Sequence, residues 1–121
     1  MDVSIEHEGI GVKILDGPYL SGGQPTPEAV SCYTSIVASI PMLKHYVAQH
    51  LLSLYNDVWF DEDIGPLDED SFAQKLDQPS VYLYDELGTV LVYFDDGDIF
   101  GGHSIEVTTR DGLPCHAQIV G

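Results

Sequence analysis

Apolar residues recur every three or four positions between residues 26 and 58, a spacing that predicts helices in this part of the chain. A helix start is expected at Thr26, because a hydroxyl N-cap, a proline at the first helical position and an acid in the first turn all stabilise this end. Pro41 interrupts the apolar pattern, so we predict two amphipathic helices that meet at this proline. The first apolar stripe consists of Val30, Tyr33, Ile36, Val37 and Ile40, and the second of Leu43, Val47, Leu51, Leu54 and Val58.

Two shorter segments border these helices. Residues 3–15 alternate loosely between apolar and polar positions and end in Asp16-Gly17-Pro18, a turn sequence, which together predict a β-hairpin. Residues 17–25 are rich in glycine and proline without a regular period, so we expect a loop there. Farther along the chain, Asp68 is expected to cap a short third helix that runs to Leu76.

Beyond Ser80 the apolar and polar residues alternate, which is the period of a β-strand. Four strands are expected, at residues 81–85, 89–94, 103–109 and 113–120, with turns between the first two and between the last two. The predicted fold class is therefore α+β: an antiparallel β-meander with an N-terminal hairpin and two to three helices packed on one face. A chain of 121 residues has room for one domain, which we expect to span residues 1–121.

The last hairpin has two conceivable registers, which differ in whether apolar residues face each other. A two-residue loop at Asp111-Gly112 would place Val107 opposite His116, an apolar residue against a polar one. A three-residue loop that ends in Gly112 instead pairs Val107 with Cys115, so we predict this second register. The same register pairs Ile105 with Ala117, His103 with Ile119 and Glu106 with His116, and Pro114 favours a strand at the sheet edge.

The charge of the chain is strongly one-sided, with twenty acidic and four basic residues and a formal net charge of −16. Thirteen of the carboxylates and a single cation, Lys75, lie between Asp57 and Asp98. Such a field repels phosphate backbones and attracts basic surfaces, which argues against nucleic-acid binding and for a basic protein partner. The alternative explanation is that the charge serves solubility alone.

The composition also bears on the setting of the protein. Aromatic residues interleave with the acids, and an acidic segment of this kind is expected to fold. No apolar run approaches the roughly 20 residues that span a bilayer, and the first residues have neither the basic nor the apolar region of a secretion signal. We therefore expect a cytoplasmic protein that starts at Met1 and does not bind membranes. Cys32 and Cys115 lie far apart in apolar patterns and are expected to be buried, reduced thiols.

The densest group of possible metal ligands is Asp95-Asp96-Gly97-Asp98 together with His103, Glu106 and His116. The expected strand pairing opposes a shared site, because His103 lies on the face of Ile105 whereas Glu106 and His116 point to the other face. We therefore interpret His103 as a structural histidine and expect no metal, no cofactor and no catalytic residue.

Two stretches of the chain resemble a known group of proteins. They are the sequence from Val47 to Trp59 and the sequence Asp96-Gly97-Asp98-Ile99-Phe100-Gly101-Gly102-His103-Ser104-Ile105-Glu106-Val107, closed by Ile119-Val120-Gly121. The set resembles small acidic bacterial proteins of a domain-of-unknown-function family with a C-terminal hairpin of this type. The resemblance implies a relation to immunity proteins of polymorphic or contact-dependent toxin systems. The resemblance implies that Gly101, Gly102 and His103 are signature positions that shape a turn and anchor a strand.

Two classes of function are consistent with these features. The first is an immunity-type protein that binds and neutralises a basic cognate toxin, such as a nuclease, by stoichiometric occlusion through an acidic surface. The second is a small enzyme or a ligand- or metal-binding domain that uses the loop from Asp95 to His103. We favour the first, because the sequence offers no convergent acid, base or nucleophile. The residues expected to bind the partner are the carboxylates Asp57, Asp61, Glu62, Asp63, Asp68, Glu69 and Asp70.

Overall fold

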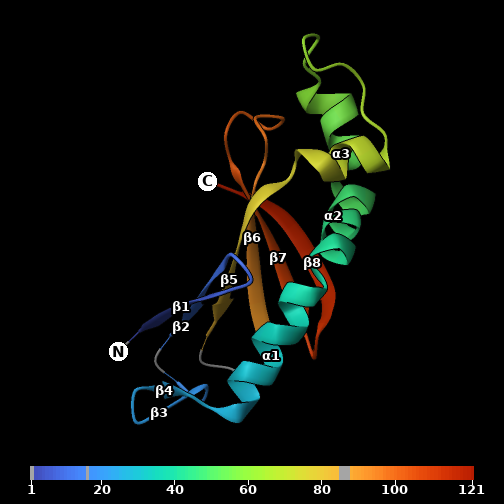
Figure 1. Ribbon diagram of the computed structural model, residues 1–121. Helices are drawn as coiled ribbons and strands as arrows, with labels where there is room; N and C mark the ends of the chain where they lie inside the picture. Colours follow the sequence, from blue (N-terminus) through green and yellow to red (C-terminus); the bar gives the residue numbers. More distant parts are fainter. Residues whose placement is uncertain (1, 16, 85–87) are drawn as a thin grey trace.

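Two layers make up the fold: a β-sheet, and helices that lie against one of its faces (Figure 1). The computed structural model describes residues 2–15, 17–84 and 88–121, and within these residues the sheet has six strands beside a separate two-stranded ribbon. The predicted α+β class is confirmed. The elements are β1 (Val3–His7), β2 (Ile10–Ile14), β3 (Leu20–Ser21), β4 (Gln24–Pro25), α1 (Pro27–Ala38), α2 (Ile40–Leu54), the π-helical turn η1 (Tyr55–Trp59), α3 (Glu69–Lys75), β5 (Asp77–Leu83), β6 (Thr89–Asp95), β7 (Ser104–Arg110) and β8 (Leu113–Val120).

The strands of the large sheet follow the order β1-β2-β5-β6-β7-β8. Strands β5 to β8 form the predicted antiparallel meander, and β1 pairs with β2 as the predicted hairpin. β2 and β5 pair in parallel, which joins the hairpin to the meander. The chain forms α1, α2 and α3 between these two strands, which is more than the dozen or so residues that a parallel crossover requires.

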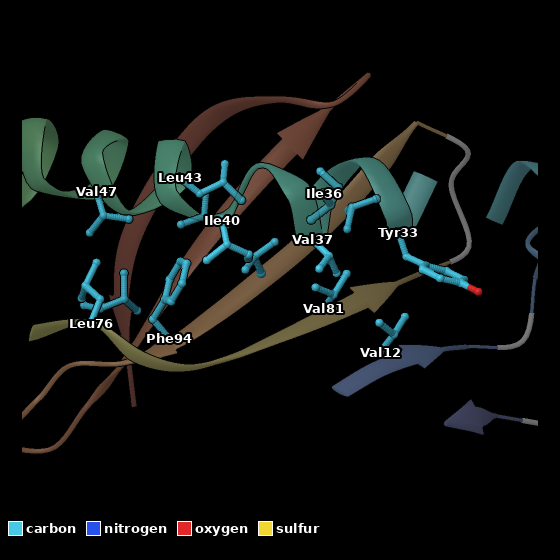
Figure 2. Packing of buried hydrophobic residues seen from close by; sticks show 14 of the residues in the cluster. Val12, Tyr33, Ile36, Val37, Ile40, Leu43, Val47, Leu76, Val81 and Phe94 are labelled. Carbon is cyan, nitrogen blue, oxygen red and sulfur yellow. The ribbon is translucent and has the colours of Figure 1, made fainter. Parts of the chain in front are cut away.

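The hydrophobic core lies between the helices and the inner face of the sheet (Figure 2). Inward-facing strand residues such as Val12, Val81 and Phe94 point toward the apolar stripes of α1 and α2. This burial of apolar area is the main force that holds the two layers together. The buried residues on the helical side include seven residues of the predicted stripes, Tyr33, Ile36, Val37, Ile40, Leu43, Val47 and Leu51, together with Phe72 and Leu76.

The prediction that Val30 and Val58 belong to the buried stripes is wrong, since these side chains are 43% and 70% exposed. The buried residue one turn before Tyr33 is Ala29, so Val30 is turned toward solvent. Val58 lies in η1, where each π-helical turn holds more residues than an α-helical turn. A spacing of four from Leu54 therefore no longer returns a side chain to the inner face.

The helix ends follow the predicted capping pattern. The hydroxyl of Thr26 accepts a hydrogen bond from the N–H of Ala29 at 3.1 Å, and Pro27 is the first residue of α1. Asp68 forms a capping box with Ser71, in which the carboxylate accepts the Ser71 N–H at 2.8 Å and the Ser71 hydroxyl accepts the Asp68 N–H at 2.9 Å. The hydrogen bond from the Ser71 N–H lowers the pKa of the Asp68 carboxyl.

The segment 17–25, expected to be an irregular loop, contains the short ribbon of β3 and β4. Gly22 and Gly23 connect the two strands, both with positive φ, 57° and 77°. A two-residue turn of this hand favours glycine, because other side chains resist this conformation. The prediction of a wholly irregular segment is wrong here, since two-residue strands are too short to show an alternating pattern.

The turn of the last hairpin also differs from the prediction. Arg110 pairs with Leu113, so the loop has two residues and not three. Asp111 and Gly112 both have positive φ, 51° and 83°, which is the conformation of a two-residue turn between twisted strands.

A β-bulge in β8 restores the apolar face that the longer loop was expected to provide. The register shifts between Thr108 and Thr109, and Cys115 is the additional residue of β8. Val107 consequently pairs with Ala117, and the predicted pairing of Val107 with Cys115 is wrong. The other observed pairs are Ile105 with Ile119, Glu106 with Gln118 and Thr108 with His116, and β8 forms the predicted sheet edge.

Candidate binding surface

The acidic segment, residues 57–70, lies at one end of the molecule, beyond the end of α2 (Figure 1). It runs from η1 through an irregular stretch into α3. All seven carboxylates predicted to bind a partner lie on it; six are exposed, and Glu69 is half-buried. The segment contains no basic residue, so it presents negative charge alone to solvent.

Hydrogen bonds at its base hold the irregular part of this segment in one shape. The side chain of Asn56 donates to the carbonyl of Leu67 at 3.0 Å and accepts the Leu67 N–H at 3.1 Å. The hydroxyl of Tyr55 donates to the carbonyl of Gly65 at 2.9 Å, and the Gly65 N–H donates to the carbonyl of Asp61 at 2.8 Å. The backbone between Tyr55 and Leu67 is therefore ordered before any partner arrives, which reduces the entropic cost of binding.

An exposed apolar patch formed by Val58, Trp59 and Phe60 lies within the acidic segment. Their exposed fractions are 70%, 39% and 45%. The patch was not predicted from the sequence, because Val58 was assigned to the core and neither Trp59 nor Phe60 was expected to be exposed. Three consecutive apolar residues at the end of a helix cannot all face one core, and this was the available signal.

Asp96 organises the loop that follows β6. Its side chain is fully buried and accepts four backbone N–H groups, from Asp98 at 2.8 Å, Phe100 at 3.1 Å, Gly102 at 3.1 Å and His103 at 2.9 Å. A buried carboxylate of this kind is stabilised by charge-assisted hydrogen bonds and shapes the backbone around it. The side chain of Asp96 therefore binds the backbone of its own loop, although its sequence position had made it a candidate metal ligand.

The three signature residues Gly101, Gly102 and His103 lie on this Asp96–His103 loop. Nδ1 of His103 is 2.6 Å from the carbonyl oxygen of Phe100, which closes the loop on itself. Gly101 and Gly102 both have positive φ, 76° and 84°, so a side chain at either position would be strained. The imidazole also packs edge-on against the indole of Trp59, with ring centroids 5.9 Å apart.

The remaining members of the candidate metal cluster lie elsewhere. Glu106 accepts hydrogen bonds from the hydroxyl of Tyr93 at 2.7 Å and from the amide of Gln118 at 2.8 Å, on the outer face of the sheet. His116 is exposed opposite Thr108. Within residues 2–15, 17–84 and 88–121, no three histidine, cysteine, aspartate or glutamate side chains are grouped as metal ligands would be.

The outer face of the sheet carries three tyrosines that the sequence analysis did not single out. The rings of Tyr82 and Tyr84 are stacked at 6.1 Å, and those of Tyr82 and Tyr93 meet edge-on at 5.2 Å. Burial, together with the hydrogen bond to Glu106, raises the pKa of Tyr93. On the face opposite the helices these three tyrosine side chains therefore pack against one another.

A hollow of about 570 Å³ lies beside the start of α1, lined by residues that include Tyr19, Cys32, Gly88 and Asp111. Cys32 is half-buried and reduced, and burial raises the pKa of its thiol. Cys115, also reduced, is exposed on the bulge of β8. The prediction that both thiols are buried is therefore wrong for Cys115, because the bulge turns this residue outward.

The two thiols should differ in reactivity. Iodoacetamide at pH 8 is expected to modify Cys115 first and Cys32 about ten-fold more slowly, because burial restricts access to Cys32 and disfavours its thiolate. Intact-mass spectrometry of Cys32→Ser and Cys115→Ser variants over time assigns each rate. Equal rates in the two variants would contradict the burial of Cys32.

A model of a bacterial protein family, described as uncharacterized protein conserved in bacteria (DUF2262), matches residues 27–119. Neither the curated proteins nor the solved structures contain a significant match. Among the described residues, none of the helices has both the length and the apolar character that a membrane span requires.

Proposed function

The chain belongs to the bacterial family DUF2262, and we propose that it is an immunity-type protein that binds a basic cognate toxin and neutralises it by stoichiometric occlusion. The observation that carries the proposal is the acidic segment, which offers seven carboxylates and no basic residue on an ordered, exposed element. The resemblance of the Asp96–His103 loop to sequences of immunity-related proteins supports the same class.

Electrostatics explains how such a surface would inhibit. A toxin that cleaves nucleic acid has a cationic active site, because it must attract phosphate. A surface that carries many carboxylates competes for the same cations and is steered toward them at a high rate. The chain would then block substrate access without any chemical step, and it would act in the cytoplasm, where a nuclease reaches its substrates.

The apolar patch supports the proposal as well. Charge complementarity mainly raises the association rate and the selectivity for a partner, so the affinity must come largely from other contacts. Exposed tryptophan and phenylalanine side chains are enriched at the centres of protein–protein interfaces. The exposed carboxylates of Asp57 and Asp61 flank this patch in sequence and could form part of the polar rim that surrounds the apolar core of a protein–protein interface.

Neutralisation of Asp61, Glu62 and Asp63 to their amides should slow association with the toxin. We expect the association rate constant at low ionic strength to fall about three- to ten-fold and its dependence on salt to become shallower, because these exposed carboxylates contribute to steering. Stopped-flow measurements between 20 and 500 mM salt, roughly the range over which the Debye length falls from tens of ångströms to a few, give both quantities.

The matched control removes the same number of charges at a distance from this segment. Glu6, Glu8 and Glu28 are exposed on the N-terminal hairpin and at the start of α1, and their amide variants remove the same three negative charges. An association rate that falls as much in the control as in the first variant would remove the acidic segment from the interface.

Co-expression tests the proposal in cells. The toxin encoded beside the gene for this chain is expected to arrest growth when expressed alone and to be tolerated when the chain is expressed with it. Growth arrest in the presence of abundant, folded chain would contradict the proposed function.

A further inference from the structure

We infer that Trp59 and Phe60 are the apolar centre of the partner interface, and that the Asp96–His103 loop holds Trp59 in its binding orientation. The inference rests on the proposed function for the identity of the partner. It adds which residues supply affinity and how the structure holds them. The partner surface that fits is a protein recess with an apolar floor and lysine or arginine side chains at its border.

The side chains of the apolar patch are partly exposed to solvent. Trp59 and Phe60 are 39% and 45% exposed, although both could bury large apolar areas. Val58, beside them, is more exposed still. An apolar cluster bordered by charged residues is typical of a protein-binding site, and tryptophan is among the residues that contribute most to affinity at such sites.

Aromatic rings from the Asp96–His103 loop support the indole of Trp59. Its indole meets the ring of Phe100 edge-on, at 5.8 Å between centroids and 82° between planes, and the ring of His103 at 5.9 Å and 69°. Phe100 is itself fully buried and meets Tyr55 and Phe72 edge-on. One edge of the indole is therefore fixed against the core while the rest remains accessible.

Hydrogen bonds hold the Asp96–His103 loop in one shape. Four backbone N–H groups converge on the carboxylate of Asp96, and the Phe100 carbonyl is bonded by His103. A Cβ atom at Gly101 would lie 3.7 Å from the Trp59 indole, so the glycine brings the backbone up to that ring. A side chain held in this way loses little conformational entropy on binding, which improves affinity.

The carboxylates near the patch favour a basic partner. Asp57 and Asp61 border the patch in sequence and are exposed, and Asp98 is exposed on the supporting loop. Lysine or arginine side chains around the recess would pair with these carboxylates. A second copy of this chain would bring like charges together, and nucleic acid would be repelled, so neither fits the patch.

Binding to the toxin of the adjacent gene tests the interface directly. Trp59→Ala and Phe60→Ala are each expected to raise Kd about 30-fold or more, mainly through faster dissociation, as truncation of a central interface residue does. Leu113→Ala is the matched control, since Leu113 is also a large exposed apolar residue but lies at the β7–β8 turn. Wild-type affinity in the Trp59→Ala variant would overturn the inference and leave the proposed function intact.

The supporting role of the loop has a readout in the isolated protein, because Trp59 is the only tryptophan. His103→Ala is expected to lower the NMR order parameter of the indole N–H into the range of flexible groups, below about 0.6. His103→Asn should restore it in part, since an asparagine amide can donate to the Phe100 carbonyl from a similar position. An unchanged order parameter in His103→Ala would show that the loop does not hold Trp59.

A core variant separates this role from general stability. Val92→Ala removes buried methyl groups from β6 and should destabilise the fold, yet it should leave the indole order parameter and the toxin affinity at wild-type values. A loss of indole order in Val92→Ala equal to that in His103→Ala would assign the effect to stability alone and overturn the positioning role.

A random peptide library displayed on phage tests the partner chemistry without the toxin. Peptides selected on the immobilised chain are expected to combine basic and apolar residues and to lose binding to Trp59→Ala. Selected peptides that are acidic, or that bind Trp59→Ala as well as wild type, would overturn the inference even if the toxin itself failed to bind. Failure of the toxin alone would count against the proposed function.

Discussion

Asp96→Ala is expected to lower the free energy of unfolding by about 3 to 5 kcal/mol. It removes four hydrogen bonds to a buried carboxylate, each worth about 1.5 to 3 kcal/mol before water replaces some of them, and it leaves the buried N–H of Phe100 without an acceptor. The midpoint of thermal unfolding should fall by roughly 10 °C or more in a domain of this size. Urea unfolding followed by circular dichroism measures the loss directly.

Asp95→Ala provides the matched control, because Asp95 precedes Asp96 in the chain but is exposed. Asp95 lies opposite Asp77 across β5 and β6, so its removal also relieves a repulsion between like charges. We expect stability within about 0.5 kcal/mol of wild type. A loss in Asp95→Ala as large as that in Asp96→Ala would contradict the role assigned to the Asp96 carboxylate.

Phe100→Ala should have an effect of similar size. Phe100 is fully buried among Tyr55, Trp59 and Phe72, and truncation of a buried phenylalanine costs about 3 to 5 kcal/mol through lost contacts and the remaining cavity. The emission of Trp59 should also shift to longer wavelength, since the indole loses its neighbour and gains water. Both quantities come from one fluorescence-detected denaturation.

The same substitution at an exposed position gives the comparison. Phe60→Ala removes an identical side chain from a residue that is 45% exposed, and we expect a loss below about 1 kcal/mol. Equal losses for Phe60→Ala and Phe100→Ala would show that the two rings do not differ in burial as described.

Most of the fold follows from patterns that the sequence carries locally. Thr26 and Asp68 start helices because their side chains accept backbone N–H groups within three residues, and this chemistry is visible in any sequence. The stripes of α1 and α2 and the alternation in β5 to β8 likewise depend on spacing alone. The bounds of α1, β6, β7 and β8 were therefore predicted within about two residues. The strand predicted at residues 81–85 is wrong at its start, since β5 begins at Asp77, and residue 85 lies outside the described residues.

The errors arise where a departure from regular geometry changes the period. The π-helical turn η1 places Val58 outside the core, and the bulge at Cys115 shifts the register of β8 by one residue. Each local departure depends on tertiary packing, which spacing does not encode. The parallel pairing of β2 with β5 was not predicted, because pairing across a long connection has no local signature.

The candidate surface was predicted only in its charge. Exposed carboxylates on an irregular segment can be expected from composition and turn residues, and six of the seven predicted carboxylates are exposed. The indole of Trp59 contacts the rings of Phe100 and His103, which lie more than 40 positions away in the sequence, so no single-sequence pattern reveals this packing. The burial of Asp96 was missed for a different reason: its four donors are close in sequence, but they converge on the carboxylate only in the folded shape of the loop.

Titration of purified toxin with this chain tests the central claim most directly. At toxin concentrations well above Kd, we predict that toxin activity falls linearly with added chain and reaches its minimum at one molar equivalent, with activity recovered when high salt separates the two proteins. Complete inactivation by a small fraction of an equivalent would indicate turnover, and full toxin activity in excess chain would mean no binding; either result would contradict stoichiometric occlusion.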